Sequence, residues 1–180
     1  FIDSTAPSTP TNLGTTSPTK DTTPSWTWDA SNYGSGVGLN NPAYELQWSQ
    51  NSGFLSGISS ATTNDANFTH SIPLADGTWY FRMRAVDAVN NYSNWSPAGQ
   101  VQIDASMPTT PGTPTTGGAV TNDDTPTWTW DASSDSGVGL GSPAYQVQWS
   151  QDGDFESGVS SNTAAGASYT HGTALEGGTW

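Results

Sequence analysis

One segment of this chain occurs twice. Trp26–Ala30 reads WTWDA, and the same letters return at Trp128–Ala132. The matched segments that follow are Ser35–Leu39 with Ser136–Leu140, Gln47–Gln50 with Gln148–Gln151, and Gly77–Trp79 with Gly178–Trp180. A period near one hundred residues is too long for a solenoid repeat and is typical of a whole small domain. The repeat therefore predicts a tandem array of one domain type, with a function that repetition serves.

The repeat divides the sequence into three parts. Residues 1–3 (Phe1–Asp3) match Gln102–Asp104 and are expected to be the end of a preceding repeat, residues 4–104 form a first domain, and residues 105–180 form a second domain. Each domain opens on a Pro- and Thr-rich segment that we interpret as a stiff connector, because proline fixes φ and donates no ladder hydrogen bond. The second domain stops at Trp180, the counterpart of Trp79. Either the polypeptide continues beyond Trp180, which we favour, or another chain supplies the missing strands.

Charge and composition exclude several functions. The net charge is -13, with 16 acidic residues against one lysine and two arginines, so no basic stripe could neutralise nucleic-acid phosphates or bind an anionic membrane. No apolar run approaches the roughly 20 residues that a membrane span needs. The chain has no cysteine, so no disulfide holds the domains, and its nine tryptophans are expected to supply much of the core.

Alternating apolar and polar residues predict short β-strands. Trp26 and Trp28 lie on one face of a strand of period two, and we place that face in the core. Further strands are predicted at Tyr44–Trp48, Phe68–Ile72, Trp79–Val86 and Val101–Ile103 and, more weakly, at Phe54–Ile58 and one short edge strand within residues 11–24, with a loop at residues 31–43. No segment shows a helical period with caps. The fold class is therefore all-β: two tandem antiparallel β-sandwich domains, the second lacking its last two strands within this chain.

The segment Leu74–Asp87, LADGTWYFRMRAVD, resembles the E–F corner and strand F of a fibronectin type III domain. The core tryptophan of the second strand and the strand Tyr44–Trp48 resemble further parts of that family. The resemblance implies a seven-stranded sandwich in which strands A, B and E face C′, C, F and G. The Asp-x-Thr-Ala-Pro, Ser-Gly-Val-Gly and Asn-x-Ser-x-Trp-Ser segments are similar to tandem repeats of large prokaryotic cell-surface and secreted proteins. Trp79 departs from the pattern, since the family usually has its corner tyrosine there. An indole can only donate a hydrogen bond, so the hydrogen bond made by the phenol of that tyrosine must be altered or lost.

No residue is expected to be catalytic, cofactor-binding or metal-binding. His70 and His171 are equivalent, and neither has a second histidine near it in the pattern, so both are interpreted as structural. Asp152–Asp154 resembles part of a calcium loop, but no bidentate Glu follows at the usual spacing, so a plain turn is favoured. Asp29 and its counterpart Asp131 have no second carboxylate placed for acid–base work. The alternative to a chain without cofactors is calcium at the interdomain connectors, beside Asp3 and Asp104.

Two surface features remain. Arg82 and Arg84 should point outward on strand F beside Glu45 and Gln47, as a cross-strand surface ladder. The N-glycosylation pattern occurs at Asn67, Asn91 and Asn94, and chance in an Asn-, Ser- and Thr-rich chain explains it equally well.

The leading functional hypothesis is a structural, non-enzymatic one: an extracellular or cell-surface stalk or fibre of tandem sandwiches, whose partners are copies of itself or neighbouring repeats. The alternative is a glycan-binding or adhesive module, or a spacer, of a cell-surface adhesin or a secreted hydrolase. Exposure of indoles separates the two, because exposed rings stack on sugars. Trp26, Trp28, Trp48 and Trp79 should be buried, which leaves Trp95 as the candidate for glycan contact.

Overall fold

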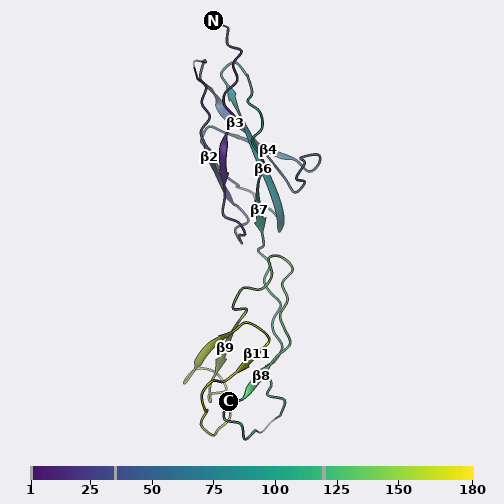
Figure 1. Cartoon of the computed structure of the whole chain (residues 1–180), viewed down its shortest axis with the longest axis vertical. Coiled ribbons are helices and arrows are strands. Elements are labelled where there is room, and N and C mark those ends of the chain that lie inside the picture. Colours follow the sequence, from purple (N-terminus) through teal and green to yellow (C-terminus); the bar gives the residue numbers. More distant parts are fainter. Residues whose placement is uncertain (1, 35, 119–120) are drawn as a thin grey trace. The chain divides into compact units, whose positions relative to one another are not determined.

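The computed structural model describes residues 2–34, 36–118 and 121–180. Phe1, part of the segment interpreted as the end of a preceding repeat, and Ser35, the first residue of one matched pair, lie outside the described residues. The chain divides into two compact units, Phe1–Ser106 (unit 1) and Met107–Trp180 (unit 2). Every regular element among the described residues is a β-strand, as predicted (Figure 1). No helix in this part of the chain is long and apolar enough to cross a membrane.

Unit 1 is a two-sheet sandwich of seven strands (Figure 1). One sheet has the order β1 (Thr11–Gly14), β2 (Ser25–Asp29), β5 (Asn67–Thr69), and the other has β4 (Ser59–Thr63), β3 (Leu39–Ser49), β6 (Gly77–Asp87), β7 (Gly99–Ile103). All neighbouring strands are antiparallel. This is the A-B-E against C′-C-F-G arrangement that the resemblance implied, so the fibronectin type III-like fold is confirmed.

Aromatic rings fill the core between these sheets. Trp26 is 1% exposed and stacks on Phe81 of the facing sheet, with ring centroids 4.7 Å apart. Trp28 is also buried and meets Tyr44 edge-on at 5.4 Å. Burying one such indole stabilises the fold by roughly 4–6 kcal/mol before entropy is counted. With no cysteine in the chain, this aromatic packing links the two layers.

The prediction that four tryptophans are buried holds for Trp26 and Trp28 and is wrong for the other two. Trp48 and Trp79 are only half-buried. Trp48 lies near the end of β3, where its ring packs on Phe68 and His70 at the margin of the core. Trp79 lies near the start of β6 and packs against the core from its margin, and its Nε1–H donates to the carbonyl oxygen of Ala75 at 2.8 Å.

Unit 2 repeats the pairings of unit 1 in the residues it shares with it. β8 (Thr127–Thr129) pairs with β11 (Ser168–Thr170), as β2 pairs with β5, and β9 (Tyr145–Trp149) pairs with β10 (Ser160–Ala164), as β3 pairs with β4. As predicted, this sequence holds no counterpart of most of β6 and of β7. Trp128 and Trp130 are half-buried, whereas their counterparts in unit 1 are buried.

Three predicted strand or loop assignments were wrong. Phe54–Ile58 is not a strand, because Phe54 has φ 52° and its N–H bonds the carbonyl of Asn51 in a tight turn. The strand in this region is β4, directly after it. Residues 39–43 were predicted to be loop but belong to β3, whose register shifts between Leu39 and Tyr44. Asn40–Pro42, two asparagines and a proline, interrupt the alternation, so this irregular part of the strand was not predicted. Ile72, placed in a strand by its alternation, lies beyond β5 and is 76% exposed.

Candidate functional site

The most elaborate side-chain cluster in unit 1 is a stack of alternating rings and guanidinium groups, which we call the arginine–aromatic ladder. Its members are Phe54, Arg82, Trp95, Arg84 and Tyr92. The Arg82 Cζ lies 4.2 Å from the Phe54 ring centroid and 4.6 Å from that of Trp95. The Arg84 Cζ lies 4.6 Å from the Trp95 centroid and 4.2 Å from that of Tyr92. These distances are within the range of cation–π attraction, so Trp95 interacts with both cations.

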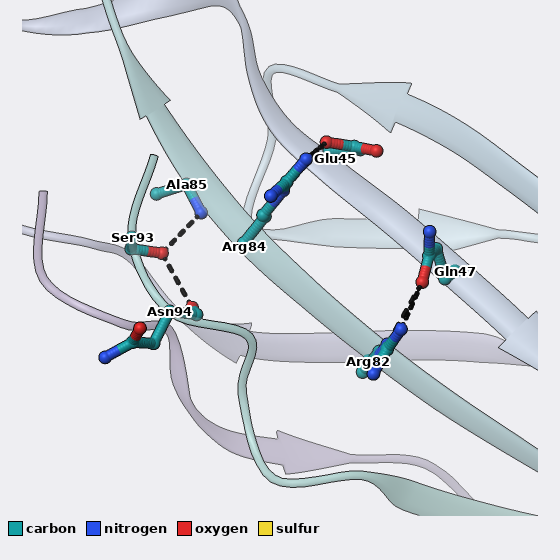
Figure 2. Close-up of polar contacts among 7 residues, drawn as sticks. All are labelled: Glu45, Gln47, Arg82, Arg84, Ala85, Ser93 and Asn94. Atoms are coloured by element: carbon teal, nitrogen blue, oxygen red, sulfur yellow. Dashed lines mark hydrogen bonds and ion pairs between the residues drawn. The ribbon is translucent and has the colours of Figure 1, made fainter. Parts of the chain in front are cut away.

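Strand register places the two arginines. They lie two residues apart on β6 and therefore project from the same face of the sheet, opposite Gln47 and Glu45 of β3. Arg84 donates from Nε and Nη2 to Glu45 Oε2 at 2.8 and 2.6 Å, and Arg82 donates from the same atoms to Gln47 Oε1 at 3.0 and 2.7 Å (Figure 2). The predicted position of the arginines beside Glu45 and Gln47 is confirmed. The side chains of Arg84 and Glu45 are 28% and 29% exposed, so water only partly screens their ion pair.

Two buried serines hold the loop that carries Trp95 against β6. Ser93 Oγ accepts from the Ala85 N–H at 2.9 Å and donates to the Asn94 carbonyl at 2.9 Å (Figure 2). Ser96 Oγ accepts from the Met83 N–H at 3.2 Å. The two hydroxyls thus accept from the N–H groups of two alternate residues of β6. Trp95 lies between the two serines in sequence, and its ring contacts the arginines that project from the same strand.

Hydrogen bonds to the carboxylate of Asp87 hold the start of the same loop. Asp87 is 1% exposed and accepts hydrogen bonds from the N–H of Val89 at 3.0 Å and from the N–H and Nδ2 of Asn91, both at 2.8 Å. Burial alone would raise the pKa of Asp87, but these hydrogen bonds outweigh it and hold the pKa below its ordinary value. Asn91 Nδ2 also donates to the Asp3 carbonyl at 3.2 Å. Asp87 therefore acts as a fixed anion that shapes a turn.

The two histidines lie in aromatic surroundings. His70 is 4% exposed and contacts Trp48, Phe68 and Phe81 edge-on, at centroid distances of 4.8, 5.1 and 6.2 Å. Burial lowers the pKa of His70 to about 4. His171 is buried in the same way against Trp149, and its Nδ1 lies 2.5 Å from the Thr173 carbonyl oxygen. Neither contact set brings a carboxylate or a second histidine to the ring.

Of the acidic candidates, Asp152 lies in a turn and Asp29 is the last residue of β2. Asp152 Oδ2 accepts from the N–H and Oγ of Ser157 at 2.9 and 2.8 Å, and Oδ1 accepts from the Asp154 N–H at 3.2 Å. The hydrogen bond from the Ser157 hydroxyl is the main reason why the pKa of Asp152 lies below its ordinary value. Asp29 accepts a hydrogen bond from the Asn12 side chain. Within the described residues, no group of three or more His, Cys, Asp or Glu side chains is arranged to hold a metal ion.

The structure distinguishes the three glycosylation patterns. Asn67 and Asn94 are exposed, whereas Asn91 is half-buried and uses its amide in the Asp87 network.

Sequence reasoning singled out Arg82, Arg84 and Trp95 one by one, and it missed Phe54, Tyr92 and the two serines as parts of the same cluster. The available signal was the run Tyr92–Ser96, YSNWS, shortly after an Arg-x-Arg strand.

Comparisons with known proteins found similarity to solved structures alone. No family model and no curated protein matches this chain. A solved Fn3-like protein from Clostridium thermocellum is 23% identical, with a TM-score of 0.42, and the match covers 55% of this chain and 95% of that one. The fibronectin type-III domain of human fibronectin type III domain containing protein 3 is 19% identical, with a TM-score of 0.40, over 58% and 94% of the two chains. The FN1–FN3 domains of chicken CNTN1 are 14% identical, with a TM-score of 0.45, over 92% and 57%.

Proposed function

We propose that this chain is a non-enzymatic structural repeat protein, in which tandem sandwiches form an extracellular or cell-surface stalk or fibre. The observation that carries the proposal is the arginine–aromatic ladder. Two of the three basic residues of the chain lie in it, and each guanidinium is engaged by a side-chain oxygen of β3 and by two rings of unit 1. A cluster whose polar groups are satisfied within the unit serves the rigidity of that unit.

Three further properties fit a stalk. Domain repetition adds length without new folding problems, because each sandwich has its own core. The absence of cysteine makes stability independent of redox conditions. A net charge of -13 opposes nonspecific clumping of neighbouring molecules. Copies of the chain or neighbouring repeats are the partners that this role requires.

The test is solution scattering from a series of proteins with two, four and eight complete repeats. A stalk predicts that the maximum particle dimension increases in proportion to the number of repeats, with a cross-section that stays constant. The matched control is the same series with Gly- and Ser-rich connectors in place of Ser4–Pro10 and Ala105–Pro111, which should scatter as a flexible string. Growth of the dimension as for a compact globule would contradict the proposal.

The second candidate is an adhesive or glycan-binding module, or a spacer in an adhesin or secreted hydrolase. One observation favours it: Tyr92, at one end of the ladder, is 46% exposed, and Trp95, at its centre, is half-buried, so part of an aromatic surface reaches solvent. A sugar stacked on Trp95 would have to compete with two guanidinium groups. Tryptophan fluorescence titrated with a glycan panel tests this role, with Tyr92→Ser as the variant that should lose any response. If no glycan changes the tryptophan fluorescence, the glycan-binding role is rejected and the structural role stands.

A further inference from the structure

We propose that Asp76 fixes the direction in which the polypeptide leaves unit 1. We call this side chain, with the two residues that it binds after β7, the joint of unit 1. The inference deepens the proposed stalk function, on which it rests, by naming a side chain that limits bending between repeats. Asp76 lies in the turn directly before β6 and is exposed, and its carboxylate contacts neither the core nor the arginine–aromatic ladder in the described part of the chain.

The sheet brings this turn to the point where the chain leaves unit 1. Gly77, the first residue of β6, pairs with Ile103, the last residue of β7. The segment after β7 therefore passes beside Asp76. Asp76 Oδ1 accepts from the Ala105 N–H at 2.9 Å, and Oδ2 accepts from the Ser106 hydroxyl at 2.6 Å. One carboxylate thus holds two consecutive residues beyond the last strand.

The hydrogen bonds to Asp76 continue a series along the same segment. The Thr19 N–H bonds the Gln102 carbonyl at 3.0 Å, and the Asp104 N–H bonds the Thr19 carbonyl at 2.9 Å. The bonds to Ala105 and Ser106 follow at once, so the backbone is tied to unit 1 as far as its last residue. The hydrogen bonds from the Ser106 hydroxyl and the Ala105 N–H hold the pKa of Asp76 below its ordinary value, so the acceptor stays ionised.

The first residues of unit 1 are held in a similar way. Asp3 Oδ1 accepts from the Thr5 N–H at 2.9 Å and Asp3 Oδ2 from the Val37 N–H at 2.9 Å. The Asp3 carbonyl is bound by Asn91, as described above. Carboxylates therefore fix the polypeptide both where it enters and where it leaves this unit, which is what a stalk of defined stiffness needs.

Unit 2 does not repeat the joint. The turn Leu74–Gly77 reads LADG in unit 1, and its counterpart Leu175–Gly178 reads LEGG, so Gly177 stands where Asp76 stands. Glycine has no side chain to accept hydrogen bonds. Units of one array can therefore differ at this position.

The test measures a distance distribution between the units of the 180-residue chain. Because the chain has no cysteine, Thr62→Cys and Ser161→Cys, at exposed strand positions of the two units, introduce the only two sites for spin labels. Pulsed electron resonance should then show a broader distribution in Asp76→Ala than in the doubly labelled parent. Ser106→Ala, which removes one of the two bonds without changing charge, should broaden it to a smaller extent.

The matched control is Asp65→Asn in the β4–β5 turn. This variant removes one exposed carboxylate that accepts no hydrogen bond from the residues the structure describes. It should leave the width unchanged. Equal widths in Asp76→Ala and the parent, or equal broadening in Asp65→Asn, would overturn the inference. Ser106→Ala keeps the test decisive if Asp76→Ala unfolds, because Ser106 lies beyond the last strand.

Failure of the joint and failure of the stalk are distinguishable. Compact scattering from the multi-repeat series, together with a broadened distribution in Asp76→Ala, would reject the stalk and keep the joint. Extended scattering with no effect of Asp76→Ala would reject the joint alone.

Discussion

Replacing Trp95 by leucine is the sharpest test of the arginine–aromatic ladder. Leucine keeps an apolar side chain at a half-buried position but removes the ring that contacts both arginines at 4.6 Å. The two serines that flank this residue bond through their own hydroxyls, so the path of the loop should survive the change.

The expected loss follows from the contacts. Each cation–π contact at a partly exposed site contributes about 0.5–1 kcal/mol, so losing two of them should lower the free energy of unfolding of unit 1 by about 1–2 kcal/mol. Smaller apolar contact area adds to this loss. A double-mutant cycle with Arg82→Met removes the area effect, because it isolates the coupling between the ring and one cation. The expected coupling is about 0.5–1 kcal/mol.

The assay is urea unfolding followed by NMR signals of β6, since signals from one unit separate its transition from that of the other. A matched cycle pairs Trp95→Leu with Gln102→Met, an exposed β7 position outside the ladder, and should show additive effects. If the effects of Trp95→Leu and Arg82→Met on the free energy of unfolding are also additive within about 0.3 kcal/mol, the ring and the cation do not attract each other measurably. The argument for a rigidifying role of the ladder then fails.

Three other predictions follow from single positions. Because burial lowers the pKa of His70 to about 4 in the folded protein, stability that is present above pH 6.5 should be lost as the pH falls through 4. The loss between pH 7 and pH 5, discounted for partial solvent screening, should be about 1 kcal/mol and should vanish in His70→Phe when thermal unfolding is measured at both pH values. Gly99→Ala places a Cβ 2.7 Å from Leu13 Cδ2 and 3.1 Å from Trp26 Cζ3, so calorimetry should show destabilisation of about 1–3 kcal/mol, whereas Gly14→Ala, whose nearest neighbour is at 3.8 Å, should be close to neutral. Excess EDTA should leave the melting temperature unchanged, because both carboxylate oxygens of Asp3 already accept N–H groups; a drop in EDTA that calcium reverses would instead support calcium at the connectors.

The sandwich was predictable because its signals are local. A period of two on β2, β3 and β6 fixes which side chains face the core, and the repeat supports each strand a second time. The pairing of Arg84 with Glu45 followed from the same alternation once the strands were taken as neighbours. The corner hydrogen bond, expected to be altered or lost, is altered: the Trp79 Nε1–H donates to the Ala75 carbonyl, and the equivalent Trp180 Nε1–H donates to the Glu176 carbonyl at 3.0 Å.

The ladder was not predictable in the same way, because its parts come from three places in the chain. Phe54, which contacts Arg82, adopts φ 52°, a left-handed conformation that no alternation pattern indicates for a phenylalanine. Tyr92 and Trp95 lie in a loop whose path is set by two serine hydroxyls that bond β6. Those serines fit a glycosylation pattern, and that interpretation obscured their structural role.

Burial differs between the two copies of WTWDA although the letters are the same. Trp26 is 1% exposed where Phe81 of β6 stacks on it, whereas Trp128 is half-buried and its ring stacks at 6.5 Å on Tyr169, which lies on its own sheet. A strand's alternation therefore selects which face turns inward, and the facing sheet decides how completely that face is covered. The same dependence holds for function within unit 1. The ladder and the turn that carries Asp76 both depend on β6, the strand that brings distant residues together, so comparisons between complete repeats of such an array should begin at β6.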